Sequence, residues 1–276
     1  MYKIYMSLFA VKIALCNCHS EVKESGFQSA KNDYTITRTG ELAEVINESS
    51  GLTPADEKGF YWTHNDSGGN NKLYRIDKTG KVSDSLQIGT AKNVDWEELT
   101  KDDSGNIYIG DFGNNSHARK NLTIYKHKDG KTEKISFRYA DQTGFPAEEK
   151  VFDCEAFFWY KGNLYLFSKD WSKKHQTKLY ILPDKPGDYS VSPKDSIFIK
   201  SQVTAADISP DGKEFTLLTY GKIFTFDVNG GKIDFSKPKA CIKVGRNQVE
   251  AINYTNNTDF IMTNEQRKVY AVVKKK

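Results

Sequence analysis

The chain contains few of the residues on which common metal sites and disulfide frameworks depend. Among 276 residues there are 4 cysteines, 5 histidines and 7 prolines. The histidines are scattered, and neither a CxxC pair nor an HExxH motif follows the N-terminal region. Together these absences exclude the usual zinc sites and a disulfide-stapled small domain.

Long apolar runs and an excess of charge of one sign are also missing. Basic residues number 40 and acidic residues 36, and Lys274, Lys275 and Lys276 supply most of the net charge of +4. No basic stripe with interleaved aromatics occurs, which argues against nucleic-acid binding. No segment has a convincing 3.6-residue apolar period, so an all-β chain is favoured.

A short phrase recurs five times and organises the rest of the chain. It reads ESSGL from Glu48, DWEEL from Asp95, DCEAF from Asp153, TAADI from Thr204 and QVEAI from Gln248. Each phrase is followed by a second apolar run and then by a third element that carries one aromatic. These aromatics, Tyr74, Tyr125, Tyr180, Phe224 and Tyr270, lie 44 to 55 residues apart. Repeats of this length, made of short strands, predict the blades of a β-propeller rather than a β-sandwich.

Strand counting predicts how the ring closes. Four repeats end in a fourth strand, whereas the fifth ends near Val273 without one. An unused strand, YTITRTGELAEVI, begins at Tyr34 before the first phrase. Pairing it with the last repeat leaves no open sheet edge. We therefore expect a single five-bladed, monomeric β-propeller domain over residues 34–276, closed by its N-terminal strand.

The N-terminal region predicts export. A mainly apolar stretch from Ile4 to Leu15 is too short to span a bilayer but suits the core of a signal peptide, although Lys12 interrupts it. Cys18 with Leu15 three positions before it resembles a lipoprotein processing site, and Cys16 is the weaker acceptor. We expect residues 1–18 to be an export signal and residues 19–33 a tether. The protein would then be lipid-anchored in the periplasm or on the cell surface; the alternatives are simple secretion and an uncleaved or cytoplasmic chain. The remaining Cys154 and Cys241 are expected to be buried free thiols.

Alternate residues of a strand share a face, so the first and third positions of the phrases should line the channel. The third positions include Ser50, Glu97, Glu155 and Glu250, with Ala206 in the fourth repeat; the first include Glu48, Asp95 and Asp153. Like charges so close raise one another's pKa unless a cation neutralises them. All-oxygen donors favour a hard cation such as calcium, with Ser50, Glu97, Glu155 and Glu250 as its ligands. The alternative is a channel filled by water and by Lys or Arg side chains.

The ligand-binding face should lie where the loops after the second strands meet. Its candidate residues are His64, Asp66, Asp111, Asn114, Arg119, Lys169, Trp171, Glu265 and Arg267. Asn, Asp and Gly are also common turn residues, so these loops have a purely structural explanation as well. Trp171, which falls in a loop, is the better candidate for stacking on a ligand than the tryptophans on strands.

ESSGL followed by KLYRIDKTGKV, and DWEEL followed by IYIGD, resemble the SdiA-regulated family of bacterial β-propellers. That resemblance implies a central metal that faces Ser50, Glu97, Glu155 and Glu250. A ring of Glu and Ser around calcium is also similar to the calcium-activated nucleotidases, which hydrolyse nucleoside diphosphates. Three functions stay open: a calcium-stabilised module that binds a ligand or protein, a calcium-dependent phosphoesterase, and a scaffold whose ion is structural.

Overall fold

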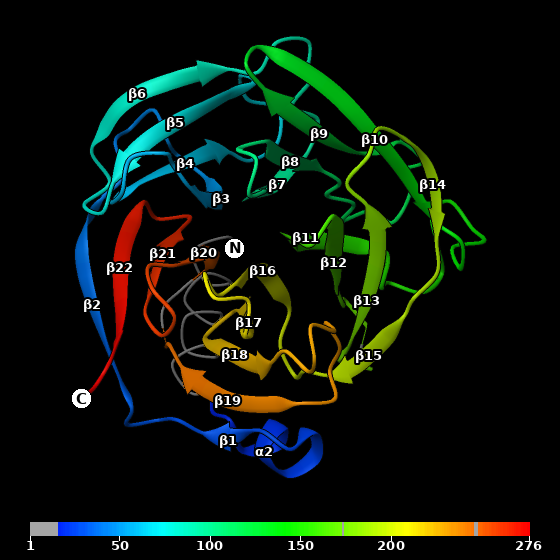
Figure 1. Cartoon of the computed structure of the whole chain (residues 1–276). Helices are drawn as coiled ribbons and strands as arrows, with labels where there is room; N and C mark the ends of the chain where they lie inside the picture. The colour runs from blue at the N-terminus through cyan, green and yellow to red at the C-terminus, as the bar shows by residue number, and fades with distance from the viewer. Residues whose placement is uncertain (1–15, 173, 246–247) are drawn as a thin grey trace, which may run out of the picture.

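The chain forms a closed ring of five antiparallel β-sheets, as the sequence predicts (Figure 1). The computed structural model describes residues 16–172, 174–245 and 248–276. The predicted core of the export signal, Ile4 to Leu15, lies outside the described residues. No described helix is both long and apolar enough to cross a membrane.

Each sheet is one blade, with its strands named from the channel outwards. Blade one contains β3 (Ser49–Pro54), β4 (Phe60–Asn65), β5 (Lys72–Asp77) and β6 (Val82–Gln87). Blade two contains β7 (Trp96–Lys101), β8 (Ile107–Asp111), β9 (Leu122–Lys128) and β10 (Lys131–Tyr139). Blade three contains β11 (Asp153–Tyr160), β12 (Asn163–Lys169), β13 (Gln176–Pro183) and β15 (Asp195–Phe198). Blade four contains β16 (Val203–Ile208), β17 (Glu214–Thr219), β18 (Lys222–Asp227) and β19 (Pro238–Lys243). Blade five contains β20 (Val249–Tyr254), β21 (Phe260–Asn264), β22 (Lys268–Lys274) and β2 (Tyr34–Glu41).

The ring closes through the N-terminal strand. β2 pairs antiparallel with β22, from Tyr34 opposite Lys274 to Glu41 opposite Lys268. The prediction that this strand completes blade five is confirmed. The five inner strands each contact the next one around the ring, including β20 against β3, so they enclose the channel.

Two short strands extend the ring beyond the predicted pattern. β14 (Gly187–Val191) pairs in parallel with β10, and β1 (Gln28–Ser29) pairs in parallel with β19. Both cover an edge that would otherwise stay open on blades two and four.

Every inner strand has a β-bulge at the equivalent position of its phrase. The position of the bulge in blade four corrects the sequence alignment of that blade. The pairing shifts register at Glu155 in β11, at Thr204 in β16 and at Glu250 in β20. Thr204, and not Ala206, therefore stands where blades two, three and five have glutamate and blade one has Ser50. The phrase in this blade is QVTAA rather than TAADI, two residues earlier, because Ala206 takes the closing apolar position that the sequence pattern gave to Ile208.

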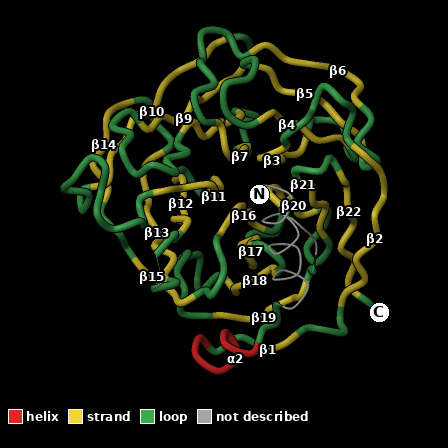
Figure 2. The backbone as a smooth tube through the Cα atoms, turned by 180° about the vertical axis from the view of Figure 1, so that it is seen from behind, coloured by secondary structure: helices red, strands yellow, loops and turns green. Residues whose placement is uncertain are grey.

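The described residues before β2 are docked on blade four, so the predicted tether over residues 19–33 is wrong. Helix α2 (His19–Ser25) lies outside β1 and β19 (Figure 2). Phe27 is 2% exposed, with its ring centroid 5.0 Å from that of Phe224. Glu21, fully buried, pairs with Lys222. These contacts and the β1–β19 pairing fix the segment against the propeller.

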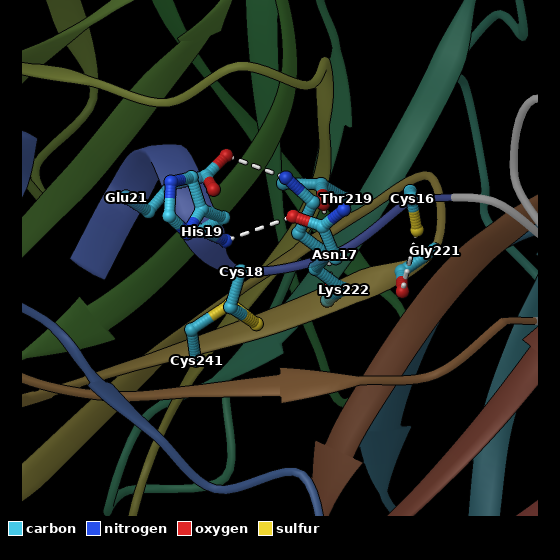
Figure 3. The surroundings of a disulfide bond; sticks show 9 residues. All are labelled: Cys16, Asn17, Cys18, His19, Glu21, Thr219, Gly221, Lys222 and Cys241. Carbon is cyan, nitrogen blue, oxygen red and sulfur yellow. Dashed lines mark hydrogen bonds and ion pairs between the residues drawn. A yellow bond between two sulfur atoms is a disulfide. The ribbon is translucent and has the colours of Figure 1, made fainter. Parts of the chain in front are cut away.

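A disulfide joins this segment to the outer strand of blade four (Figure 3). It links Cys18 to Cys241, so the prediction of a free thiol at Cys241 is wrong. Cys154 is a buried free thiol, as expected. A sulfur atom in a disulfide cannot also form the thioether bond to a lipid. The prediction of lipidation at Cys18 is therefore wrong as well. The sequence around Cys18 does not indicate that its disulfide partner lies 223 positions away.

Candidate functional site at the channel mouth

The mouth of the channel is the end at which the inner strands begin, and the loops after the second strands meet there. The backbone N–H of Asp66 donates to the carbonyl of Glu48 at 2.9 Å, and that of Gly113 donates to the carbonyl of Asp95 at 3.2 Å. In blade five the N–H of Glu265 donates to the carbonyl of Gln248 at 3.1 Å. These bonds hold the loops beside the starts of the inner strands, as the strand order predicts.

Three carboxylates gather on one side of the mouth. Asp66, Asp95 and Glu97 each present an oxygen within 4.8 Å of the other two. Glu97 is 6% exposed, whereas Asp66 and Asp95 are partly open to solvent. We call these three residues the acidic triad. One of them was predicted as a metal ligand, one for the second ring and one for the ligand face, so the structure brings together residues that the sequence placed in three groups.

Gly113 makes the close approach of the loop possible. A Cβ on this residue would lie 2.0 Å from an Oε1 atom of Glu97 and 2.5 Å from the carboxylate of Asp95. Any side chain here would therefore fill the space in front of the triad. The backbone of blade two's loop forms the wall of the site at this point.

Burial and neighbouring carboxylates raise the pKa values of all three triad residues, although Arg119 beside Asp95 acts in the opposite direction. Burial, followed by the neighbouring carboxylates, raises the pKa of Asp95 to about 6. Burial likewise raises the pKa of Asp66 to about 6. Burial and the charges of Glu155 and Asp66 raise the pKa of Glu97 well above its ordinary value. A cation bound between the three would favour their ionised forms.

The other two predicted glutamates have partners of their own. Glu155 forms an ion pair with Lys169, and both side chains are almost fully buried. Glu250 accepts a hydrogen bond of 2.9 Å from the hydroxyl of Tyr220. Burial alone would lower the pKa of Lys169, but the charge of Glu155 raises it, so the lysine is a fixed cation. Ser50 is buried at the bulge of blade one.

Several predicted residues hold the loops in place. Asp153 accepts from the N–H of Asn114 and from the indole Nε1–H of Trp171, both at 2.7 Å. Arg119 pairs with Asp111 at 2.9 Å and lies 4.0 Å from Asp95. Trp171 remains 43% exposed, and its role on a ligand face stays a prediction.

Other predicted residues lie away from the site. His64 is completely buried, with its ring 5.5 Å from that of Trp96, so its placement on the ligand face is wrong. Burial lowers its pKa to about 4. A β-strand alternates its faces, and His64 points between blades one and two instead of toward solvent. Arg267 pairs with Glu41 of the closing strand. Glu265, by contrast, lies at the mouth, where it accepts a hydrogen bond from Gln248 and interacts with Glu250.

Glu98 is a functional candidate that the sequence patterns did not single out. Its buried carboxylate accepts hydrogen bonds from the N–H groups of Leu99, Leu52 and Ala206, at 2.9, 3.1 and 3.3 Å. It thus connects blades one, two and four across the channel. The doubled glutamate of DWEEL was the available signal, because the bulge in blade two spans both Glu97 and Glu98.

Comparison with known proteins supports the fold and goes no further. No family model matches the chain, and no curated protein matches it, so the resemblance to the SdiA-regulated family is not confirmed. Among solved structures, a gluconolactonase from Xanthomonas campestris is similar at 10% identity, with a TM-score of 0.50 over 90% of this chain and 96% of that one. The PQQ-bound aldose sugar dehydrogenase of Streptomyces coelicolor is similar at 8% identity, with a TM-score of 0.50 over 87% and 98%. Both are propeller proteins, and at these identities the likeness concerns the fold alone.

Proposed function

We propose that this protein is an exported, calcium-dependent binding module whose ligand face is the channel mouth. The observation that carries the proposal is the acidic triad: three carboxylates within 4.8 Å of one another, with raised pKa values. Oxygen donors of this kind suit calcium, whose coordination shell is flexible and whose remaining positions accept water or a ligand. Asp66, Asp95 and Glu97 would hold the ion.

The arrangement favours an asymmetric site over the central ring that the sequence suggested. Glu155 is neutralised by Lys169, and Glu250 accepts from Tyr220, so neither is as available as the triad. The ion would therefore sit toward blades one and two, beside the loop of Gly113. It would lower the pKa of each triad residue and so remove the cost of charging them together.

The Cys18–Cys241 disulfide supports export. Disulfides form and persist mainly in oxidising compartments outside the cytoplasm, where calcium is also abundant. Attachment to a membrane through Cys16, whose thiol is free in the structure, stays a prediction.

Hydrolysis of a phosphate ester is the second candidate, and the cations of the mouth weigh against it. Lys169 is paired with Glu155, and Arg119 with Asp111. Each cation is therefore already balanced by a carboxylate, which weakens its attraction for a phosphate. Trp171, by contrast, offers an exposed ring for contact with a ligand.

Calorimetric titration with calcium tests the proposal. We expect wild-type protein to bind one ion, and both Glu97→Gln and Asp66→Asn to weaken binding at least about tenfold, since each removes a charged ligand. Glu44→Gln, at an exposed position outside the site, is the matched control. Equal calcium affinity in all four proteins would contradict the proposal. Calcium-dependent hydrolysis of ADP or of phosphate monoesters, abolished by Glu97→Gln, would replace the binding role with the enzymatic one.

A further inference from the structure

A cavity opens at the end of the channel opposite the mouth, where the inner strands end. Its volume is about 740 Å³, and all five inner strands contribute to its lining. One lining residue from each inner strand is, in turn, Thr53, Thr100, Trp159, Asp207 and Asn253. This size is that of a small-molecule site and is far larger than an ion needs.

The base of this cavity contains a hydrogen-bond acceptor that no described residue satisfies. Asn253 is only 3% exposed, and its Oδ1 atom has no partner within the described part of the chain. Its Nδ2 group donates to Asp207 at 2.8 Å, and the N–H of Tyr254 donates to the same carboxylate at 2.7 Å. An unpaired buried acceptor is costly, and a ligand that supplies a donor would remove that cost.

The side chains on the walls and rim of this cavity also indicate which class of ligand it could bind. Trp159 and Tyr160 are half-buried and add aromatic surface to the lining. The rim carries both signs of charge, and Lys101 is already paired with Asp56 at 3.1 Å. A strongly anionic ligand would face the carboxylate of Asp207 at the base. Burial raises the pKa of this residue to about 7, and a neutral hydroxyl group can hydrogen-bond to it in either protonation state.

We propose that this cavity binds a neutral polyhydroxylated molecule of mono- to disaccharide size. Adjacent hydroxyl groups of the ligand donate to Asp207 and to Oδ1 of Asn253, and the aromatic side chains contact the apolar face of its ring. A hydroxyl pair can satisfy both acceptors at once, which an inorganic anion without a donor cannot do. This site is separate from the acidic triad and does not depend on calcium at the mouth.

The test is a binding screen of full-length protein against neutral sugars. Glucose, galactose, mannose, ribose, N-acetylglucosamine, maltose and cellobiose serve as probes, with glycine, lysine and inorganic phosphate as charged competitors. Saturation-transfer NMR identifies binders, and calorimetry gives their affinities. We expect at least one sugar to bind, with no dependence on EDTA.

Variants locate the binding. Asn253→Ala and Asp207→Asn should each weaken sugar binding about tenfold or more, because each removes an acceptor from the base. Asp103→Asn, on the exposed rim, is the matched control and should bind normally. Calcium affinity at the mouth and circular dichroism show that each variant is folded.

Three results would overturn the proposal. The first is the absence of binding by every sugar in the panel. The second is sugar binding that both base variants retain at full affinity while remaining folded. The third is selective binding of the amino acids or of phosphate, which would assign the cavity to a charged ligand.

Discussion

Blades two and four share one strand plan but carry different chemistry. Blade two supplies Asp95, Glu97 and Glu98 to the channel, together with the Gly113 loop that lies against the triad. Blade four has Thr204 at the corresponding bulge, and its hydroxyl donates to the carbonyl of Val249 at 2.8 Å. Its own carboxylate, Asp207, stands at the far end of the channel instead.

The outer edges of the two blades differ as well. Blade two is covered by β14, a strand that lies between β13 and β15 of blade three in the chain. Blade four is covered by β1, α2 and the Cys18–Cys241 disulfide. The acidic wall of the mouth therefore faces a blade that is covalently reinforced and carries no carboxylate at the bulge. Of these two blades, blade two carries carboxylates at the mouth and blade four carries the covalent cross-link.

Opening the ring should have the largest effect on folding and solubility, because the β2–β22 pairing closes the ring that contains both blades. A chain that begins at Ile46 lacks β2 and leaves β22 as a bare edge, so we expect aggregation on expression. A chain that begins at Tyr34 keeps β2 but lacks the segment on blade four, and it should fold with a lowered melting temperature. Size-exclusion chromatography and thermal melts distinguish the two. A soluble chain from Ile46 that melts like the chain from Tyr34 would mean that β2 is not needed for closure.

Removing the Cys18–Cys241 disulfide should destabilise the protein through blade four. Cys18→Ser is expected to lower the free energy of unfolding by about 3 kcal/mol, the usual effect of a disulfide that closes a long loop. Urea unfolding measures this loss. Wild-type protein in reducing agent should match the variant, while Cys16→Ser should behave like wild type. If reductant has no effect on wild-type stability, the bond either does not form or does not constrain the chain.

The Glu98 carboxylate connects blades two and four through hydrogen bonds. Its removal should lower the free energy of unfolding somewhat less than loss of the disulfide does. Glu98→Ala leaves the N–H groups of Leu52, Leu99 and Ala206 without their acceptor, so we expect a loss of about 2 kcal/mol in unfolding free energy. Glu98→Gln keeps one amide oxygen as acceptor and should lose less than half as much. Urea titrations of both variants provide the comparison. Equal losses would show that the carboxylate does not act through these hydrogen bonds.

The pH dependence of stability should be the smallest effect and is specific to the triad. The pKa values of Asp66 and Asp95 are raised to about 6 in the folded state, so the folded protein binds more protons than the unfolded chain between about pH 4 and 6. Their contribution to stability is therefore present at low pH and is lost as the pH rises through about 6. His64, with its pKa lowered to about 4, acts in the opposite direction between about pH 4 and 6.5.

The double variant Asp66→Asn, Asp95→Asn separates these contributions. Without calcium, its unfolding free energy should fall by at least about 1 kcal/mol less than that of wild type between pH 4 and 7, because residues 66 and 95 no longer ionise. Calcium should reduce the same fall in wild type and leave the variant unchanged. Denaturant melts across this pH range supply the measurement. Parallel curves for the two proteins would exclude an electrostatic cost at the triad.

Repetition explains why so much of the fold could be predicted. Five phrases and the register of Tyr74 to Tyr270 define the blades, and strand counting identifies β2 as the closing strand. The alignment of blade four was wrong because Ile208 was the stronger apolar residue in the sequence, whereas the bulge at Thr204 sets the register. A bulge is decided by pairing with the next strand, which short motifs do not record.

Side-chain partners were harder to predict than the strands. The glutamate column correctly marks the channel, but the pairing of Glu155 with Lys169 depends on a residue from the next strand of the same blade. The acidic triad combines a loop of blade one with the inner strand of blade two. The Cys18–Cys241 bond joins residues 223 positions apart. Such contacts arise from the closed ring and are not local properties of the chain.

The most direct test of the account is the position of calcium in crystals of the full chain grown with the ion. Anomalous diffraction should show one strong peak at the mouth, with carboxylate oxygens of Asp66, Asp95 and Glu97 about 2.4 Å from it. The Lys169–Glu155 pair should remain intact. A peak ligated by Glu155 and Glu250 on the channel axis, or the absence of any peak at the mouth, would contradict the asymmetric site.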